Sequence, residues 1–223
     1  MIQIENVEVF GWAAAIRGMR NPMNSWADSD SSWEYIEDPR TMQTAPFQFH
    51  VGPKDEKLMR KLAEAGTDHG KFLRMIHVQC DLVAPFYWYK EMDTYRAGVE
   101  KNSCSTMHKI HAREIKMIDF STDRLKPTAL RQLLATIKTM NSYRALFVQT
   151  KLKEYWDQLI QLLPSSYNQR RTYDMSYAAL RAMYHARKNH KLQEWRDFCA
   201  WCEMLPHAYL ITGETTPSTG EAA

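Results

Sequence analysis

A short turn in the middle of the chain gathers the side chains best suited to chemistry. It places one thiol, Cys104, between two hydroxyls, Ser103 and Ser105. Three basic residues lie close by in the sequence: Lys101, His108 and Lys109. The thiolate is the nucleophilic form of cysteine, and nearby cations favour it by lowering the pKa of the thiol. The turn therefore predicts either a reactive nucleophile or a ligand-contacting loop, and the alternative is an inert surface cysteine.

Clusters of basic residues could bind a phosphate. The first contains His108, Lys109, His111 and Arg113, and two later pairs are Arg170–Arg171 and Arg187–Lys188. Guanidinium groups match phosphate oxygens in a two-pronged geometry. Each cluster could instead be a solvated face, and the first could be an exposed basic strand edge. The pattern leaves both interpretations open.

The cysteines and histidines do not form a convincing metal site. Cys199 and Cys202 are a C-x-x-C pair on a predicted helix, and Cys80 and Cys104 lie far apart. A zinc site of this kind needs a second close pair. His108 and His111 lack a third ligand. We therefore expect no metal, and free thiols as in a reducing cytoplasm.

Composition indicates a single globular domain over residues 1–212, followed by a polar tail over 213–223 that we expect to be disordered. The formal net charge of +3 is too small to predict nucleic-acid binding. No apolar run reaches the roughly eighteen residues of a membrane span. The first residues carry Glu5 and Glu8 without a basic run, so we expect no secretory signal and a cytoplasmic location.

Hydrophobic spacing divides the first half into strands and helices. Alternating apolar residues over 2–9 predict a strand, and a helix follows near 12–20. The stretch 20–53 is polar but contains aromatic residues, so we expect a long ordered loop or an aromatic-lined lid. The remaining expected elements are a helix over 54–66, a strand over 72–83, a helix over 86–96 and a strand over 114–120.

The second half reads as helical. Pro127 begins a long apolar-periodic segment that reaches Pro164, and a kink or break near 141–142 would keep it within ordinary helix length. A helix to Arg187 follows with Asp174 as its N-cap, and another covers 192–204. Strands first and helices later argue against a doubly wound parallel sheet and favour an α/β (α+β) fold. No G-x-G-x-x-G follows a strand, so no Rossmann site is predicted.

The block over 58–107 resembles the flavin-dependent thymidylate synthases (ThyX). In that family Ala-Pro opens a helix that delivers an R-H-R-x7-S signature. Here Ala84-Pro85 stands in the corresponding place, Arg96 matches the third signature position, and Cys104 occupies the Ser position. The other signature positions differ: Thr94 and Tyr95 replace Arg and His, and Thr106 replaces the Arg after the Ser.

A second block, 170–198, is similar to the C-terminal nucleotide-binding segment of the same family. Arg187 and Gln193 keep its R-x5-Q spacing, and Leu163-Pro164 matches an upstream Leu-Pro. Ile160 replaces a nucleotide-binding Arg. The resemblance implies a ThyX-like fold with a central, mostly antiparallel sheet, long helices packed against it and a helix-rich C-terminal half.

The resemblance also implies roles for individual residues. For substrate binding these are Arg187, Arg96 and Gln193; for cofactor binding, His69, Arg74, Tyr95 and Arg96; and for catalysis, Cys104, Ser103 and Ser105. Arg187 and Arg96 could equally be surface arginines, and His69 a surface histidine at a helix end.

The implied reaction is the reductive methylation of dUMP to dTMP, with FAD, NADPH and 5,10-methylenetetrahydrofolate as cofactors, in a homotetramer with shared active sites. The changed signature leaves two alternatives. One is a different pyrimidine-nucleotide modification on the same fold. The other is a non-catalytic nucleotide-binding, flavin-binding or assembly protein.

Overall fold

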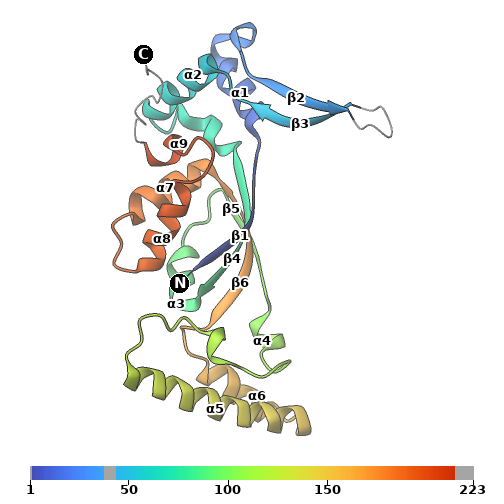
Figure 1. Ribbon diagram of the computed structural model, residues 1–223, viewed down its shortest axis with the longest axis vertical. Coiled ribbons are helices and arrows are strands. Elements are labelled where there is room, and N and C mark those ends of the chain that lie inside the picture. The colour runs from blue at the N-terminus through green and yellow to red at the C-terminus, as the bar shows by residue number, and fades with distance from the viewer. Residues whose placement is uncertain (1, 38–43, 214–223) are drawn as a thin grey trace.

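Four antiparallel strands form the central sheet in the order β1-β4-β6-β5. They are β1 (Gln3–Phe10), β4 (His77–Pro85), β6 (Asn168–Ser176) and β5 (Val99–Ser103). The computed structural model describes residues 2–37 and 44–213. Figure 1 shows an elongated molecule, with helices along one side of the sheet, a two-stranded ribbon projecting at one end and a helix pair at the other.

The two faces of the sheet differ because side chains alternate along each strand. On β6, Tyr173 and Met175 are buried while Arg170 and Thr172 are exposed. The open face is polar, and at its centre Asp81 accepts hydrogen bonds from three side chains: Thr172 (2.6 Å), Asn6 (2.8 Å) and Arg170 (2.9 Å). These bonds, that from Thr172 above all, lower the pKa of Asp81 to about 2.

Helices from both halves of the chain lie along the other side of the sheet and at its end nearest the ribbon (Figure 1). They are α1 (Trp12–Arg20), α2 (Pro53–Glu64), α3 (Phe86–Met92), α7 (Tyr177–Arg187), α8 (Gln193–Cys202) and α9 (Tyr209–Thr212). Their core is aromatic: Trp88, Trp195 and Phe198 are fully buried, and the Trp88 and Trp195 rings lie 4.7 Å apart. Rings of this size bury the largest area per residue, so this contact fixes α3 against α8.

A second, smaller core lies at the far end of the molecule. It is formed by α5 (Pro127–Thr150) and α6 (Lys153–Leu162), with Leu133, Ile137, Met140 and Leu159 buried between them and the preceding loop. The helices are separated at Lys151, which adopts a left-handed conformation with φ 61°. A short helix, α4 (Thr106–Lys109), and the loop after it connect this pair to the sheet.

The ribbon pairs β2 (Ser32–Glu37) with β3 (Thr44–His50). Its base is fixed to α2 by Asp55, whose fully buried carboxylate bonds Arg20 (2.6 Å), the Ser29 hydroxyl (2.6 Å) and the Ser31 hydroxyl (2.7 Å). One charged acceptor thus gathers donors from α1 and from the segment that leads into the ribbon.

The α+β class, the first strand and the helix over 12–20 are confirmed. The prediction of a loop or lid over 20–53 is wrong where β2 and β3 form. The predicted strand over 72–83 begins only at His77, because Phe72 and Leu73 are consecutive buried residues and lie in a 3₁₀ helix over Gly70–Arg74. The predicted strand over 114–120 is replaced by a 3₁₀ turn over Met117–Asp119. Asp119 stabilises that turn by accepting from the backbone N–H of Lys116 at 2.8 Å.

The second half also needs corrections. Asp174 is not a helix cap: it lies in β6, and Ser176 caps α7 by accepting from Ala179 N–H at 3.2 Å. The break in the long helix comes at Lys151 and not near 141–142. The helix over 86–96 ends at Met92, where the Thr94 hydroxyl bonds the Glu91 carbonyl at 2.7 Å. Strands β5 and β6 and helix α9 were not predicted.

The predicted disordered tail lies outside the described residues from 214 onward. Among the described helices, none combines the length and the apolar character that crossing a bilayer requires.

Candidate functional site

The most organised group of predicted site residues surrounds Arg187, at the C-terminal end of α7. Its Nε donates to the Tyr95 hydroxyl at 2.9 Å, and its Nη1 donates to Glu91 Oε2 at 2.6 Å. The guanidinium carbon lies 5.0 Å from the Trp195 ring centroid, a cation–π distance. We call Arg187, Glu91, Tyr95, Trp195 and His190 the Arg187 cluster.

Glu91 is the centre that holds this cluster in place. Besides Arg187, the same carboxylate oxygen accepts from Trp195 Nε1 at 3.1 Å, and His190 Nε2 lies 3.2 Å away. A carboxylate with several donors keeps them in one arrangement. The sequence patterns do not single out Glu91, although its position four residues before Tyr95, in the last turn of the helix that follows Ala84-Pro85, is a signal that could identify it.

The arrangement leaves one edge of Arg187 available. In the described part of the chain, no hydrogen bond occupies Nη2, and the side chain is 21% exposed. A planar guanidinium held at two nitrogens presents the third in a fixed direction. Arg187 can therefore donate from Nη2 to one carbonyl oxygen without rearrangement.

Arg96 and Gln193 are the two other residues predicted to bind the substrate, and each lies close in sequence to a member of the Arg187 cluster. Arg96 follows Tyr95, is exposed, and has no ion pair among the described residues. Gln193 begins α8 and is engaged locally, donating to Asp197 at 2.8 Å and accepting from Arg196 Nε at 3.1 Å. Arg96 is thus a free cation, while Gln193 is already bonded within its own helix.

The Cys104 turn lies elsewhere, between the end of β5 and α4. Cys104 is exposed and borders a hollow of about 630 Å³, together with Ser105, Lys109 and Arg113. Its backbone is fixed: Cys104 N–H donates to Arg170 O at 3.0 Å, and Gln169 Nε2 donates to Cys104 O at 2.7 Å. Ser103 lies in β5 opposite Arg171.

The cations around this turn are not equivalent. Lys101 bonds Asp93, and Arg113 forms a two-pronged pair with Asp119 at 2.6 and 2.8 Å. Lys109 borders the hollow, and in the described residues no carboxylate pairs with it. The basic cluster is therefore not a strand edge: it lies on α4 and the following loop, and Lys109 is the member available to a ligand.

The other cysteines are poor nucleophiles. Burial raises the pKa of Cys80 to about 12 and that of Cys199 to about 11. Burial also raises the pKa of Cys202. Among the described residues, no group of three or more His, Cys, Asp or Glu side chains could hold a metal ion. Cys104 is the exposed thiol of the described chain.

The predicted cofactor residues lie at the two ends of the 3₁₀ helix after α2: His69 directly precedes it and Arg74 is its last residue. Arg74 borders a hollow of about 180 Å³ that also includes Arg181 of α7 and Thr67. Arg74 is exposed, and its guanidinium has no hydrogen bond or ion pair within the described residues. His69 is exposed and does not border this hollow.

The structure brings some of the predicted residues together and leaves others apart. Arg187 and Tyr95 are in direct contact. The hollow beside Cys104 includes no described residue of α7 or α8, and the one beside Arg74 includes neither Cys104 nor Arg187. Within one chain, the candidate residues thus form three separate groups.

Comparison with known proteins gives no match in sequence: no protein-family model matches the chain, and no curated protein matches it.

Solved structures match over nearly the whole chain. Flavin-dependent thymidylate synthase ThyX from Helicobacter pylori, complexed with FAD and dUMP, superposes with a TM-score of 0.67 at 16% identity, covering 95% of this chain and 98% of that one. The UMP/dUMP methylase PolB from Streptomyces cacaoi, bound with 5-Br UMP, gives 0.59 at 13% identity and 97% coverage of both. The predicted likeness to ThyX is therefore confirmed for the fold: this chain has the ThyX fold.

Proposed function

We propose that this protein is a flavin-dependent enzyme that methylates the base of a uridine nucleotide. The observation that carries the proposal is the Arg187 cluster, because a part-buried arginine is held at two nitrogens with its third left to donate. The ThyX fold supports it, since both the thymidylate synthase and PolB share that fold. At 13–17% identity the reaction does not transfer with the fold, so the residues must support it.

Arg187 is suited to polarise a uracil carbonyl. A donor fixed before the substrate arrives stabilises charge on that oxygen without reorganisation, and the surrounding Trp195 and Tyr95 rings limit water. Glu91 largely balances the charge of Arg187, which makes this arginine a weak phosphate ligand. Because the Cys104 turn and the Arg187 cluster lie apart within one chain, we propose that Arg96 binds the phosphate beside Arg187, and that Lys109 and the Cys104 turn of a second copy contact the same substrate.

Within one chain, the described residues provide only part of a site for FAD. Arg74 and Arg181 at the small hollow are the guanidinium donors that a diphosphate requires. A hollow of about 180 Å³ is too small for a whole dinucleotide, since sites for such ligands span roughly 300–1,000 Å³. Arg74 would therefore hold the phosphates. We propose that a second copy encloses the ring, in the homotetramer that the resemblance implies.

FAD, once reduced by NADPH, would supply the hydride, and 5,10-methylenetetrahydrofolate the carbon. The residues of this chain would bind and orient the nucleotide and exclude water. Cys104 is exposed and borders its hollow, and we propose it as the nucleophile that adds to the pyrimidine ring or, failing that, as a substrate contact.

PolB is described as acting on both UMP and dUMP, which makes UMP an alternative substrate here. The substitutions at Thr94, Tyr95 and Thr106 motivate this alternative, because they give this chain a different set of hydrogen-bond donors from that of the ThyX signature.

The test begins with the absorbance spectrum of the purified protein, followed by FAD titration and by assays of NADPH oxidation and methylated product with dUMP or UMP. We expect flavin binding and product with at least one nucleotide. Product from dUMP alone supports thymidylate synthesis, and product from UMP supports the alternative. Protein that binds no flavin and makes no product from either nucleotide would contradict the proposal and favour a binding or assembly role.

A Cys104→Ser variant distinguishes the two roles of the turn. Loss of product with unchanged nucleotide affinity supports attack by the thiol, whereas an altered nucleotide affinity supports a contact. If neither changes, the Cys104 thiol has no part in the reaction.

A further inference from the structure

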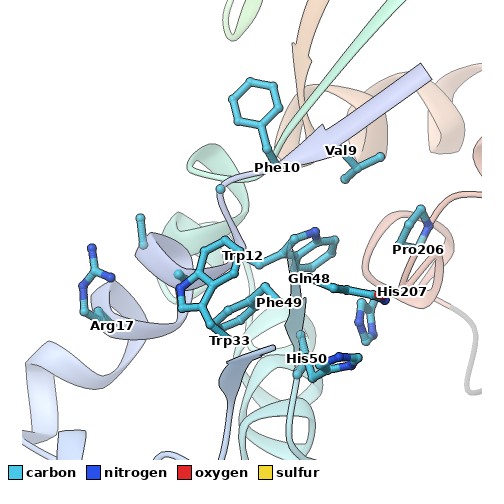
Figure 2. A pocket seen from close by; sticks show the side chains of 14 residues that line it. Val9, Phe10, Trp12, Arg17, Trp33, Gln48, Phe49, His50, Pro206 and His207 are labelled. Atoms are coloured by element: carbon cyan, nitrogen blue, oxygen red, sulfur yellow. The ribbon is translucent and has the colours of Figure 1, made fainter. Parts of the chain in front are cut away.

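We propose that a hollow at the start of α1 is a second ligand site, which takes a planar aromatic molecule carrying a negative charge. The hollow has a volume of about 740 Å³ and lies between the start of α1, the β2–β3 ribbon and the loop at Pro206–His207 (Figure 2). It shares no residue with the Arg187 cluster, the Cys104 turn or the Arg74 hollow. The hollow is therefore separate from the residues of the proposed reaction.

Aromatic rings from three segments form its walls. Trp33 and Phe49 of the ribbon meet edge to face at 5.1 Å, and Trp12 meets His207 at 4.9 Å. Figure 2 shows these side chains gathered around the hollow with Phe10 at its edge. Phe10 is 42% exposed and Trp33 is 44% exposed. Rings that pack edge to face leave ring faces available, and a flat ligand covers such faces by stacking.

The polar groups at the hollow favour an anion. Trp12, Ala13 and Ala14 of the first turn of α1 border it, and this turn has neither a side-chain cap nor an acidic residue. Arg17, one turn further, also borders the hollow and is exposed, without an ion pair in the described residues. No aspartate or glutamate is found among the described residues that border the hollow. The surroundings are therefore complementary in charge to a phosphate or carboxylate.

The walls are held in place before any ligand arrives. Gly11 precedes α1 with φ 95°, and a Cβ at this position would meet the Met75 carbonyl oxygen at 2.0 Å, so the chain direction at the start of α1 depends on glycine. The ribbon is fixed at its base by the Asp55 hydrogen bonds. A hollow whose walls are fixed costs little ordering on binding.

Size and chemistry together define the ligand class. About 740 Å³ lies in the usual range for small-molecule sites of roughly 300–1,000 Å³. Stacking faces select a flat ring system, and the helix start with Arg17 selects a negatively charged group. Free nucleotides and related heteroaromatic phosphates have both features.

The test is isothermal titration of the full chain with two probes of this class, FMN and AMP. Riboflavin and adenosine serve as the same rings without phosphate. We expect at least one phosphorylated probe to bind, with its dephosphorylated form at least about fivefold weaker. If neither FMN nor AMP binds at millimolar concentration, or if removal of the phosphate has no effect on affinity, the proposal is wrong.

Variants locate the binding. Trp33→Ala should raise Kd at least about tenfold, as expected for the loss of one stacking partner. Tyr35→Ala is the matched control, because Tyr35 is an exposed aromatic residue of the same strand that does not border the hollow. Arg17→Gln should raise Kd several-fold for the phosphorylated probe alone. Equal weakening by Trp33→Ala and Tyr35→Ala would overturn the assignment.

FMN could also bind at the proposed flavin site, and Arg74→Ala separates the two. FMN binding that survives Arg74→Ala and is lost in Trp33→Ala belongs to the aromatic hollow. Binding that is lost only in Arg74→Ala belongs to the proposed catalytic site and counts against the second site. Circular dichroism and melting temperatures confirm that each variant is folded.

Discussion

Arg20 and Arg187 each pair with a carboxylate at 2.6 Å, yet their surroundings differ. Arg20 is 5% exposed and every nitrogen is engaged: Nε bonds Asp55, Nη1 bonds Ser25 O at 3.0 Å, and Nη2 bonds Asp28 O at 3.3 Å. Arg187 is 21% exposed and keeps Nη2 available in the described structure. All three guanidinium nitrogens of Arg20 thus have partners within the fold, whereas Arg187 has partners at only two of its three nitrogens.

This difference indicates what each pair does. A saturated buried pair fixes the segments that supply its partners, here α1, α2 and the base of the ribbon. A pair with an open edge gives up some stability and retains a directed donor for a ligand. The distance within the ion pair, which is the same in both, does not separate these roles. The roles are separated by the number of guanidinium nitrogens left without a partner and by the exposure of the arginine side chain.

The largest expected effect follows from Asp55→Asn. The substitution leaves the Arg20 guanidinium buried without its counter-charge, so we expect the free energy of unfolding to fall by about 3–5 kcal/mol. Denaturant titration of the purified protein measures it. A loss below about 1 kcal/mol would show that Arg20 and Asp55 are not the fixed pair described here.

A double-mutant cycle sharpens this result. Arg20→Met combined with Asp55→Asn removes both partners, so the combined loss should be clearly smaller than the sum of the two single losses. Simple additivity would indicate that the Ser29 and Ser31 hydrogen bonds, and not the charge of Arg20, account for the effect of Asp55.

The second prediction concerns Arg187→Ala. Loss of a charged donor should weaken nucleotide binding by about 1.5–3 kcal/mol. Stability should change less than in Asp55→Asn, because Glu91 keeps its contacts with Trp195 and His190. Titration with dUMP and UMP measures affinity. Arg187→Lys is the control, because it keeps the positive charge but loses the forked guanidinium. If its nucleotide affinity lies between those of the natural chain and Arg187→Ala, the charge matters. If its affinity equals that of Arg187→Ala, the guanidinium geometry is required.

Unchanged nucleotide affinity in a folded Arg187→Ala protein would remove Arg187 from the site. Glu91→Gln then reports on positioning. If Glu91 orients Arg187, the Glu91→Gln variant should have a lower catalytic turnover although Arg187 itself is unchanged. If Glu91 is only structural, the variant should change the melting temperature alone.

The third prediction concerns acid stability. Burial alone would raise the pKa of Asp55, but hydrogen bonds from Ser29, Ser31 and Arg20 outweigh it and lower the pKa below its ordinary value of 3.8. A carboxyl whose pKa is lower in the folded protein stabilises it above pH 4, and this contribution is lost as the pH falls further. Thermal melts from pH 7 to pH 3 should therefore show a steeper acid loss for the natural chain than for Asp55→Asn. Parallel curves would assign the acid sensitivity to other carboxylates.

Much of the fold could be predicted from local patterns. Alternation over 2–9 and apolar spacing over 12–20 predict the first strand and helix, because Ile4 and Val9 of β1 pack partly against the core and α1 buries one face. Strand β6 could not be found this way. Its alternating Arg170, Thr172 and Asp174 lie on the polar face of the sheet, and only pairing with β4 explains why they are extended.

For the candidate site too, one part could be predicted from the sequence and another part could not. The family spacing placed Arg187 and Tyr95, and the fold brings them within 2.9 Å. The role of Glu91 depends on Trp195 and His190, about a hundred residues further along the chain. The aromatic hollow cannot be predicted for a related reason: the sequence around Trp33 predicts a loop or lid, but the residues that border the hollow with Trp33 come from α1, β3 and the Pro206–His207 loop.

The smallest expected effect concerns a third ion pair, which tests whether the distance between two charged groups alone determines how much the pair contributes to the free energy of unfolding. Lys153 and Asp157 lie 2.5 Å apart on α6, with side chains 77% and 33% exposed. Water competes for both groups, so Asp157→Asn should lower the free energy of unfolding by only about 0.3–0.5 kcal/mol, less in high salt. Denaturant titrations at low and high salt measure it. A loss comparable to that of Asp55→Asn would mean that short contact, and not burial with a full set of donors, distinguishes the arginines of this fold.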